Sequence, residues 1–119
     1  MAAPNIVNVA TIIGRTVGAA LGTSSADIVT NSAGSNKVFK VNAIYVSNVD
    51  GTNNADATVA FFDASASATY EIAHTMTVPA DATLDALSKA IYLEEGDKIT
   101  ALASAVRDLE IIVSFEEIS

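Results

Sequence analysis

Residues 43–65 read AIYVSNVDGTNNADATVAFFDAS, and this stretch decides the fold class. Two runs rich in apolar and β-branched residues flank the polar tract VDGTNNAD at 49–56. Branched side chains fit a pleated surface and lose rotamer freedom in a helix, so both runs predict strands. Asp-Gly and Asn-Asn pairs favour tight or left-handed backbone, so the tract between the runs predicts a turn.

The first of these strands is expected over Lys37–Val49, where apolar and polar residues alternate. Period-two alternation places residues two apart on the same face of a strand. The expected face therefore holds Phe39, Val41, Ala43 and Tyr45.

The remaining chain repeats the same pattern in short pieces. A strand over 70–78 is expected to carry Tyr70, Ile72, His74, Met76 and Val78 on one face. Pro79 ends it, because proline removes a ladder donor. Further strands are expected at 26–30, 57–63, 83–88, 90–93, 98–104 and 109–118, the last two forming a closing hairpin around AVRD. In the turn EEGD at 94–97, Gly96 supplies a positive φ.

About seven to nine short strands, with turn signals roughly every 8–12 residues, predict an all-β fold. The expected architecture is a single-domain antiparallel β-sandwich, and both jelly-roll and immunoglobulin-like connectivity fit this spacing. Within one domain of 119 residues, 1–36 form an N-terminal arm with the first strands, and 37–119 form the sandwich body. A helical turn in TLDALSKAIYL at 83–93 is the alternative, because apolar residues recur there at helical spacing.

Charge and cysteine content exclude several classes of protein. The net charge is −8, and the acids concentrate in residues 50–119. An acidic half repels phosphate backbones, so we expect no nucleic-acid binding. The chain has no cysteine, which excludes disulfides and thiolate metal sites and fits assembly in a reducing bacterial cytoplasm.

The apolar segment 6–22 is not expected to cross or bind a membrane. It is short for a span and is interrupted by Asn8 and Arg15. The start MAAPN has no basic residue, so a secretory signal is not expected either. Such a segment joins its own sheet or lies on a neighbouring subunit.

The polar tract does not match an EF-hand calcium loop. Counted from Asp50 as an EF-hand, the sixth and twelfth positions are not the required Gly and Glu. A looser calcium site formed by Asp50, Asn53 and Asp56 stays open as an alternative.

No catalytic constellation is visible in the sequence. His74 is the only histidine, has no local nucleophile or acid, and is expected to be half-buried or at an interface. The acids Glu94, Glu95 and Asp97 are expected to form a solvated turn rather than a paired-carboxylate site. We therefore expect no enzyme, no catalytic or metal residues and no cofactor.

Carbohydrate binding is a further possibility for a β-sandwich, because sugar rings stack on exposed aromatic side chains. The chain has no tryptophan, and Tyr45, Tyr70 and Tyr92 all fall in expected strands rather than loops. This placement argues against a sugar site on the loops.

Four stretches taken together resemble small virion structural proteins of tailed bacteriophages, particularly those of marine and cyanobacterial phages. They are NAIYVSNVDGTNNADATVAFFDAS, YEIAHTMTVPADATL, IYLEEGDKITALAS and the ending SFEEIS. The resemblance covers about residues 40–119. It implies a non-enzymatic β-sandwich that decorates or cements the capsid surface, often as a homotrimer, with the major capsid protein as its partner. A neck, tail or fibre-associated adaptor of the virion is the alternative.

The apolar N-terminal region lies outside this resemblance. Its excess of apolar residues, with one arginine among them, predicts a segment that contacts the capsid or another subunit. The expected contact residues are Ile6, Val7, Val9, Ile12, Ile13, Arg15, Val17 and Leu21.

Overall fold

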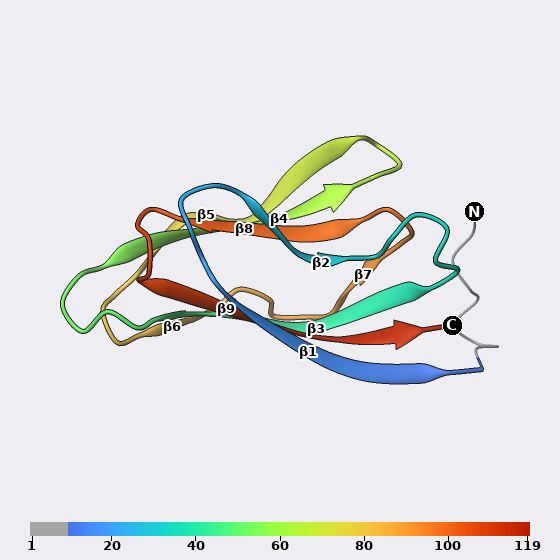
Figure 1. Ribbon diagram of the computed structural model, residues 1–119, viewed down its shortest axis with the longest axis horizontal. Coiled ribbons are helices and arrows are strands. Elements are labelled where there is room, and N and C mark those ends of the chain that lie inside the picture. Colours follow the sequence, from blue (N-terminus) through green and yellow to red (C-terminus); the bar gives the residue numbers. More distant parts are fainter. Residues whose placement is uncertain (1–9) are drawn as a thin grey trace.

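The chain folds into nine strands and contains no helix within residues 10–119, which are the residues that the computed structural model describes. Figure 1 shows the strands arranged as two layers. Their bounds are β1 Ile12–Ala20, β2 Ala26–Thr30, β3 Val38–Asn48, β4 Ala55–Asp63, β5 Ala68–Val78, β6 Thr83–Asp85, β7 Ile91–Leu93, β8 Lys98–Ala103 and β9 Leu109–Ile118. The predicted all-β sandwich is confirmed, and the helical alternative at 83–93 is wrong, since that segment forms β6 and β7.

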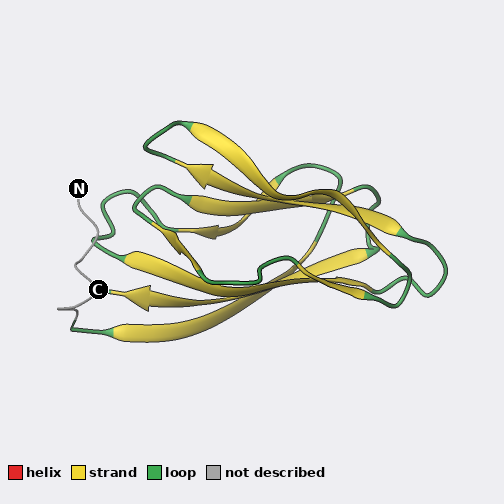
Figure 2. Cartoon of the chain, turned by 180° about the vertical axis from the view of Figure 1, so that it is seen from behind, coloured by secondary structure: helices red, strands yellow, loops and turns green. Residues whose placement is uncertain are grey.

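The order of the strands identifies the connectivity as a jelly roll. One sheet runs β1-β9-β3-β6, with β7 also paired to β3, and the other runs β2-β8-β4-β5. All pairings are antiparallel. Successive strands lie in opposite layers except for β4–β5 and β6–β7, as in a double-sheet jelly roll. Figure 2 shows the two layers from behind. Tertiary pairing thus decides between the two connectivities that the sequence left open.

The core lies between β3 and β9 of one sheet and β4 and β8 of the other. In β9 the buried residues alternate with more exposed ones from Leu109 to Glu116, and Ile111 and Val113 are fully buried. Phe115 stacks on Phe39 of β3 with 5.1 Å between ring centroids. These apolar residues leave water on folding, which is the main stabilising contribution to a domain of this kind.

The predicted closing hairpin is wrong. β8 pairs with β2 and β4, whereas β9 pairs with β1 and β3 in the opposite sheet. The AVRD connection therefore crosses from one layer to the other instead of reversing within a layer. Arg107 in this connection has a positive φ of 69°. The same turn residues fit both a hairpin within one sheet and a connection between the two sheets. Only the burial of both strands in the core distinguishes the second arrangement from the first.

The predicted face of β3 is also wrong beyond its midpoint. The pairing of β3 with β9 shifts register between Val41 and Ala43, which marks a β-bulge at Asn42. A bulge adds one residue and inverts the alternation that follows it. As a result Ile44 is fully buried, whereas Tyr45 is 42% exposed.

β5 departs from its predicted face for the same reason. Its pairing with β4 shifts register twice, and Thr75 has a positive φ of 45°. Ala73 and Val78 are buried, while His74 and Met76 are exposed. The residues that were predicted to share one face of β5 therefore lie on both of its faces.

β1 and β2 are integral parts of the sandwich. β1 pairs with β9 along its whole length, and β2 pairs with β8. In residues 10–119, no helix is long and apolar enough to cross a membrane.

Candidate functional site

The polar tract at 49–56 is a self-contained turn. Asp50 Oδ1 accepts hydrogen bonds from the backbone amides of Thr52 and Asn53, at 2.8 and 3.2 Å. Those bonds, above all the one from Thr52, hold the pKa of Asp50 below its ordinary value. The carboxylate of Asp56 instead accepts the hydroxyl of Thr77 at 2.8 Å. The carboxylates of Asp50 and Asp56 therefore accept hydrogen bonds from different groups and do not share a ligand.

A second carboxyl group faces this turn. Partial desolvation, followed by the negative charge of nearby Asp50, raises the pKa of Asp108 above its ordinary value. The backbone also joins the two loops, because the amide of Val49 donates to the carbonyl of Asp108 at 2.7 Å. Within residues 10–119, no three His, Cys, Asp or Glu side chains gather as metal ligands.

The acids of the EEGD turn have structural roles. Asp97 is 4% exposed, and its carboxylate accepts the amides of Ala64 and Glu94 at 2.9 Å each. Glu95 accepts the amide of Asn36. Asp97 is therefore a buried turn anchor, so the expectation of a wholly solvated turn is wrong for this residue.

His74 lies on the surface. Its side chain is 69% exposed and pairs through Nδ1 with Glu71 Oε1, three residues earlier on β5. The expectation of a half-buried histidine is therefore wrong. The cause is the irregular pairing of β4 with β5, which turns His74 away from the core.

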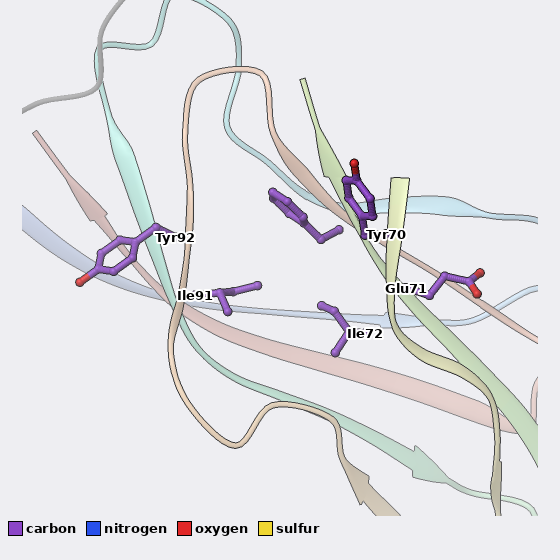
Figure 3. Close-up of a pocket in the computed structure, with 6 residues that line it drawn as sticks. Tyr70, Glu71, Ile72, Ile91 and Tyr92 are labelled. Carbon is purple, nitrogen blue, oxygen red and sulfur yellow. The ribbon is translucent and has the colours of Figure 1, made fainter. Parts of the chain in front are cut away.

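The feature best suited to binding is an apolar groove between the two sheets. It has a volume of about 240 Å³ and is lined by Phe61, Tyr70, Glu71, Ile72, Ile91 and Tyr92. β4 and β5 supply one wall, and β7 of the opposite sheet supplies the other. Figure 3 shows Ile72 and Ile91 pointing toward each other across the groove, while Glu71 and Tyr92 point away from it.

Two exposed tyrosines lie on the strands that form this groove, Tyr70 on β5 and Tyr92 on β7, but the side chain of Tyr92 points away from it. Tyr70 is 57% exposed and Tyr92 is 44% exposed. Tyrosine is enriched at binding surfaces because a rigid apolar ring also carries a polar hydroxyl. The groove thus offers an apolar floor with the exposed Tyr70 beside it, a surface suited to another protein's apolar side chain.

The sequence did not predict this groove, although Tyr70 and Tyr92 were both assigned to strands. Ile72 and Ile91 lie in different expected strands, and nothing local indicates that those strands meet across the sandwich. Exposure of Tyr45, Tyr70 and Tyr92 was missed as well, since strand placement alone does not say which face a side chain occupies.

The predicted partner-contacting residues fall into three groups. Ile6, Val7 and Val9 lie outside the described residues. Ile12, Ile13, Arg15 and Val17 lie on β1, the outermost strand of its sheet. Leu21 is 3% exposed and belongs to the core.

Arg15 is tied to the end of β9. Its Nε lies 2.5 Å from Glu117 Oε2, while Lys37 Nζ lies 2.9 Å from the other carboxylate oxygen. The hydrogen bond from Lys37 is the main reason that the pKa of Glu117 lies below its ordinary value. Arg15 therefore also stabilises the sheet itself.

No family model matches the chain, and no curated protein sequence matches it either. Two solved structures share its fold at low sequence identity. One is a chain from Bacillus endospore appendages, described as disulfide-linked pili, with a TM-score of 0.54, 15% identity, and coverage of 92% of this chain and 88% of that one. The other is a chain from the acidic stable capsid structure of Helicobacter pylori bacteriophage KHP30, with a TM-score of 0.58, 10% identity, and coverage of 94% and 90%. At these identities the likeness establishes a shared fold.

Proposed function

We propose that this chain is a non-enzymatic structural protein of a virion, which binds the outer face of the major capsid protein lattice and stabilises the head. The observation that carries the proposal is the apolar groove between β5 and β7, with exposed Tyr70 and Tyr92 beside it. A stiff sandwich that presents such a surface is suited to adhesion. The sequence resemblance to phage virion proteins and the fold shared with a chain of a phage capsid structure support this role.

Decoration acts by bridging several shell subunits at once. Each contact can be modest, because the second and later contacts of one bound molecule form at high effective concentration. We propose a homotrimer as the bound form, as the resemblance implies. The net charge of −8 keeps the free protein soluble before it binds.

The experiment is a binding titration of the purified protein on phage heads that lack it. We expect saturation at a fixed ratio to the shell protein, with on the order of hundreds of copies per head, as a symmetric lattice requires. About a dozen copies confined to one vertex would instead support the neck or tail adaptor. Failure to bind heads at all would overturn both versions.

The groove is tested by the variant Tyr70→Ser. Aromatic anchors of this kind commonly contribute about 2 kcal/mol or more, so head affinity should fall at least about 30-fold. Tyr45→Ser is the matched control, because Tyr45 is 42% exposed and does not line the groove. Equal affinity of Tyr70→Ser and the control would remove the groove from the proposal.

The N-terminal segment is a second contact in this proposal. Ile6, Val7 and Val9 supply apolar side chains ahead of β1. The informative truncation removes residues 1–9 alone, since β1 is part of the sheet. We expect a folded β-rich protein with weakened head binding, and full occupancy by the truncated protein would contradict this part of the proposal.

A further inference from the structure

The outer edge of β1 is long and regular. β1 pairs with β9 at nine consecutive positions without a register shift. Within residues 10–119 no strand pairs with its other side. Eight of its nine residues are exposed, including Ile12 at 58% and Ile13 at 42%. An exposed regular edge is a template for pairing with another strand.

The other sheet edges of the molecule carry features that hinder such pairing. β2 has five residues and a register shift, and its Asp27 is paired with Lys98. β5 has two register shifts and exposes Glu71 and His74. β6 and β7 have three residues each. Bulges, charges and short length are the usual protections of an edge. β1 has none of them except Arg15, which is held against Glu117.

The hydrogen-bond pattern shows which backbone groups of β1 are free. Thr11 and Ser119 exchange both of their backbone hydrogen bonds, at 3.0 and 2.9 Å. In an antiparallel ladder such pairs recur at every second residue. The amide of Leu21 donates to the carbonyl of Leu109 in the same phase. The odd-numbered residues of β1 therefore bond to β9, and the even-numbered residues direct their N–H and C=O groups outward.

We infer that β1 pairs antiparallel with β1 of a second copy of this chain, about a two-fold axis at Thr16. This register places every outward-facing residue opposite another, and the pairs are Ile12 with Ala20, Gly14 with Gly18, and Thr16 with itself. The register forms about ten backbone hydrogen bonds, because the two residues of each of these pairs exchange both of their N–H···O bonds. Large side chains meet small ones at both ends, and the glycines meet near the centre. The isologous pairing joins the two sheets into one continuous sheet.

The inference does not rest on the proposed function, because the pairing is a property of the isolated chain. A two-fold isologous pairing cannot by itself generate a three-fold arrangement, so a trimer requires other contacts. A trimer of the kind proposed above would therefore pair into a hexamer or link to neighbouring trimers across two-fold axes.

The first test is the mass of the isolated protein in solution, by light scattering. We expect an even multiple of 12.2 kDa. The variant Thr16→Pro should halve that mass, because the amide that it removes faces outward rather than toward β9. Thr16→Ala keeps the amide and should keep the mass. An odd multiple, or a mass that Thr16→Pro leaves unchanged while the variant remains β-rich, would overturn the inference.

Charged substitutions at Thr16 provide a second test, which remains informative if the proline variant does not fold. Thr16→Lys and Thr16→Glu each place like charges directly opposite one another on the axis, so each alone should lose the pairing. A mixture of the two variants should recover it as a heterodimer. If both single variants keep the wild-type mass, the axis does not lie at Thr16 and the inference is wrong.

Cysteine cross-linking tests the register, since the chain has no cysteine of its own. Residues that form a hydrogen-bonded antiparallel pair have Cα atoms about 5.5 Å apart, which is within the range that a disulfide can bridge. Thr16→Cys should therefore cross-link under mild oxidation. Ile12→Cys is the matched control, because this register separates the two copies of that residue by roughly 27 Å. Equal cross-linking of both variants would contradict the proposed register.

Discussion

Lys37 Nζ lies 2.9 Å from Glu117 Oε1, and this ion pair joins the start of β3 to the end of β9 across 80 residues of sequence. Arg15 approaches the other oxygen of the same carboxylate. The Glu117 side chain is only 12% exposed, so two cations surround a carboxylate that is largely removed from water. The three strands at this end of the sheet are thereby tied together.

Glu117→Gln should lower the free energy of unfolding at pH 7, with a pH dependence that identifies the cause. The pKa of Glu117 lies below its ordinary value of 4.5, so the wild type gains stability from this group above pH 4.5. That gain is lost as the pH falls below 4.5 through the lowered pKa. The difference in Tm between wild type and variant should therefore shrink on acidification.

The matched control for this experiment is Glu116→Gln, which removes the same charge from the neighbouring residue. Glu116 lies on the opposite side of β9, and within residues 10–119 both Arg15 and Lys37 pair with Glu117 instead. A Tm difference of Glu117→Gln that stays constant from pH 7 to pH 3 would contradict the assignment.

Asp108→Asn should stabilise the protein at neutral pH. Desolvation and the neighbouring Asp50 raise the pKa of Asp108 above 3.8, so its ionised form disfavours the folded state. This penalty is present at neutral pH and disappears as the pH falls through the raised pKa. The variant should therefore unfold at a higher temperature than wild type at pH 7 and at an equal temperature in acid. Glu110→Gln, which removes one charge from the exposed side of β9, is the control; an equal gain from it would point to net charge alone.

Asn48→Ala should cost about 2 kcal/mol or more of unfolding free energy. Asn48 is 4% exposed, and its amide donates to the carbonyls of Asn53 and Val78 at 2.9 and 2.8 Å. Removing it leaves buried carbonyls without partners, at about 1–3 kcal/mol for each. Denaturant unfolding measures the loss, and Asn42→Ala at the exposed bulge of β3 serves as the control. A loss no larger than that of the control would show that water replaces the amide.

Gly96→Ala should destabilise the chain more than Gly34→Ala does. Both glycines have positive φ, 90° and 80°, so both variants incur backbone strain of about 1–3 kcal/mol. A Cβ atom at Gly96 would also lie 2.8 Å from Ala64 Cβ, whereas Gly34 has nothing within 4 Å. Thermal unfolding of the two variants separates the steric cost from the backbone cost. Equal losses would show that the loop at Ala64 moves aside freely.

The sequence predicted the local features well. Alternation of apolar and polar residues indicated the strands, and β5 does end at Val78 before Pro79. Gly96 has the positive φ that its turn predicted. The alternation of buried and more exposed residues in β9 runs from Leu109 to Glu116. These features depend on residues within a few positions of each other, so they are visible in the sequence itself.

Faces were predicted less well, because a bulge inverts the alternation without any local signal. Tyr45 lies outward only because Asn42 is extra in the pairing of β3 with β9. The groove likewise depends on β5 and β7 approaching from opposite sheets. Neither effect exists until the partner strand is in place.

Short strands joined by defined turns follow from the residues alone, since side-chain periodicity and turn chemistry are local properties. The pairing of the strand that begins at Leu109 with β3 rather than with β8, and hence the jelly roll, became visible only in the folded chain. Strand pairing depends on the burial of whole sheet faces, and these are formed by residues far apart in the chain. The same choice left β1 at an open edge and placed Ile72 opposite Ile91 in the groove.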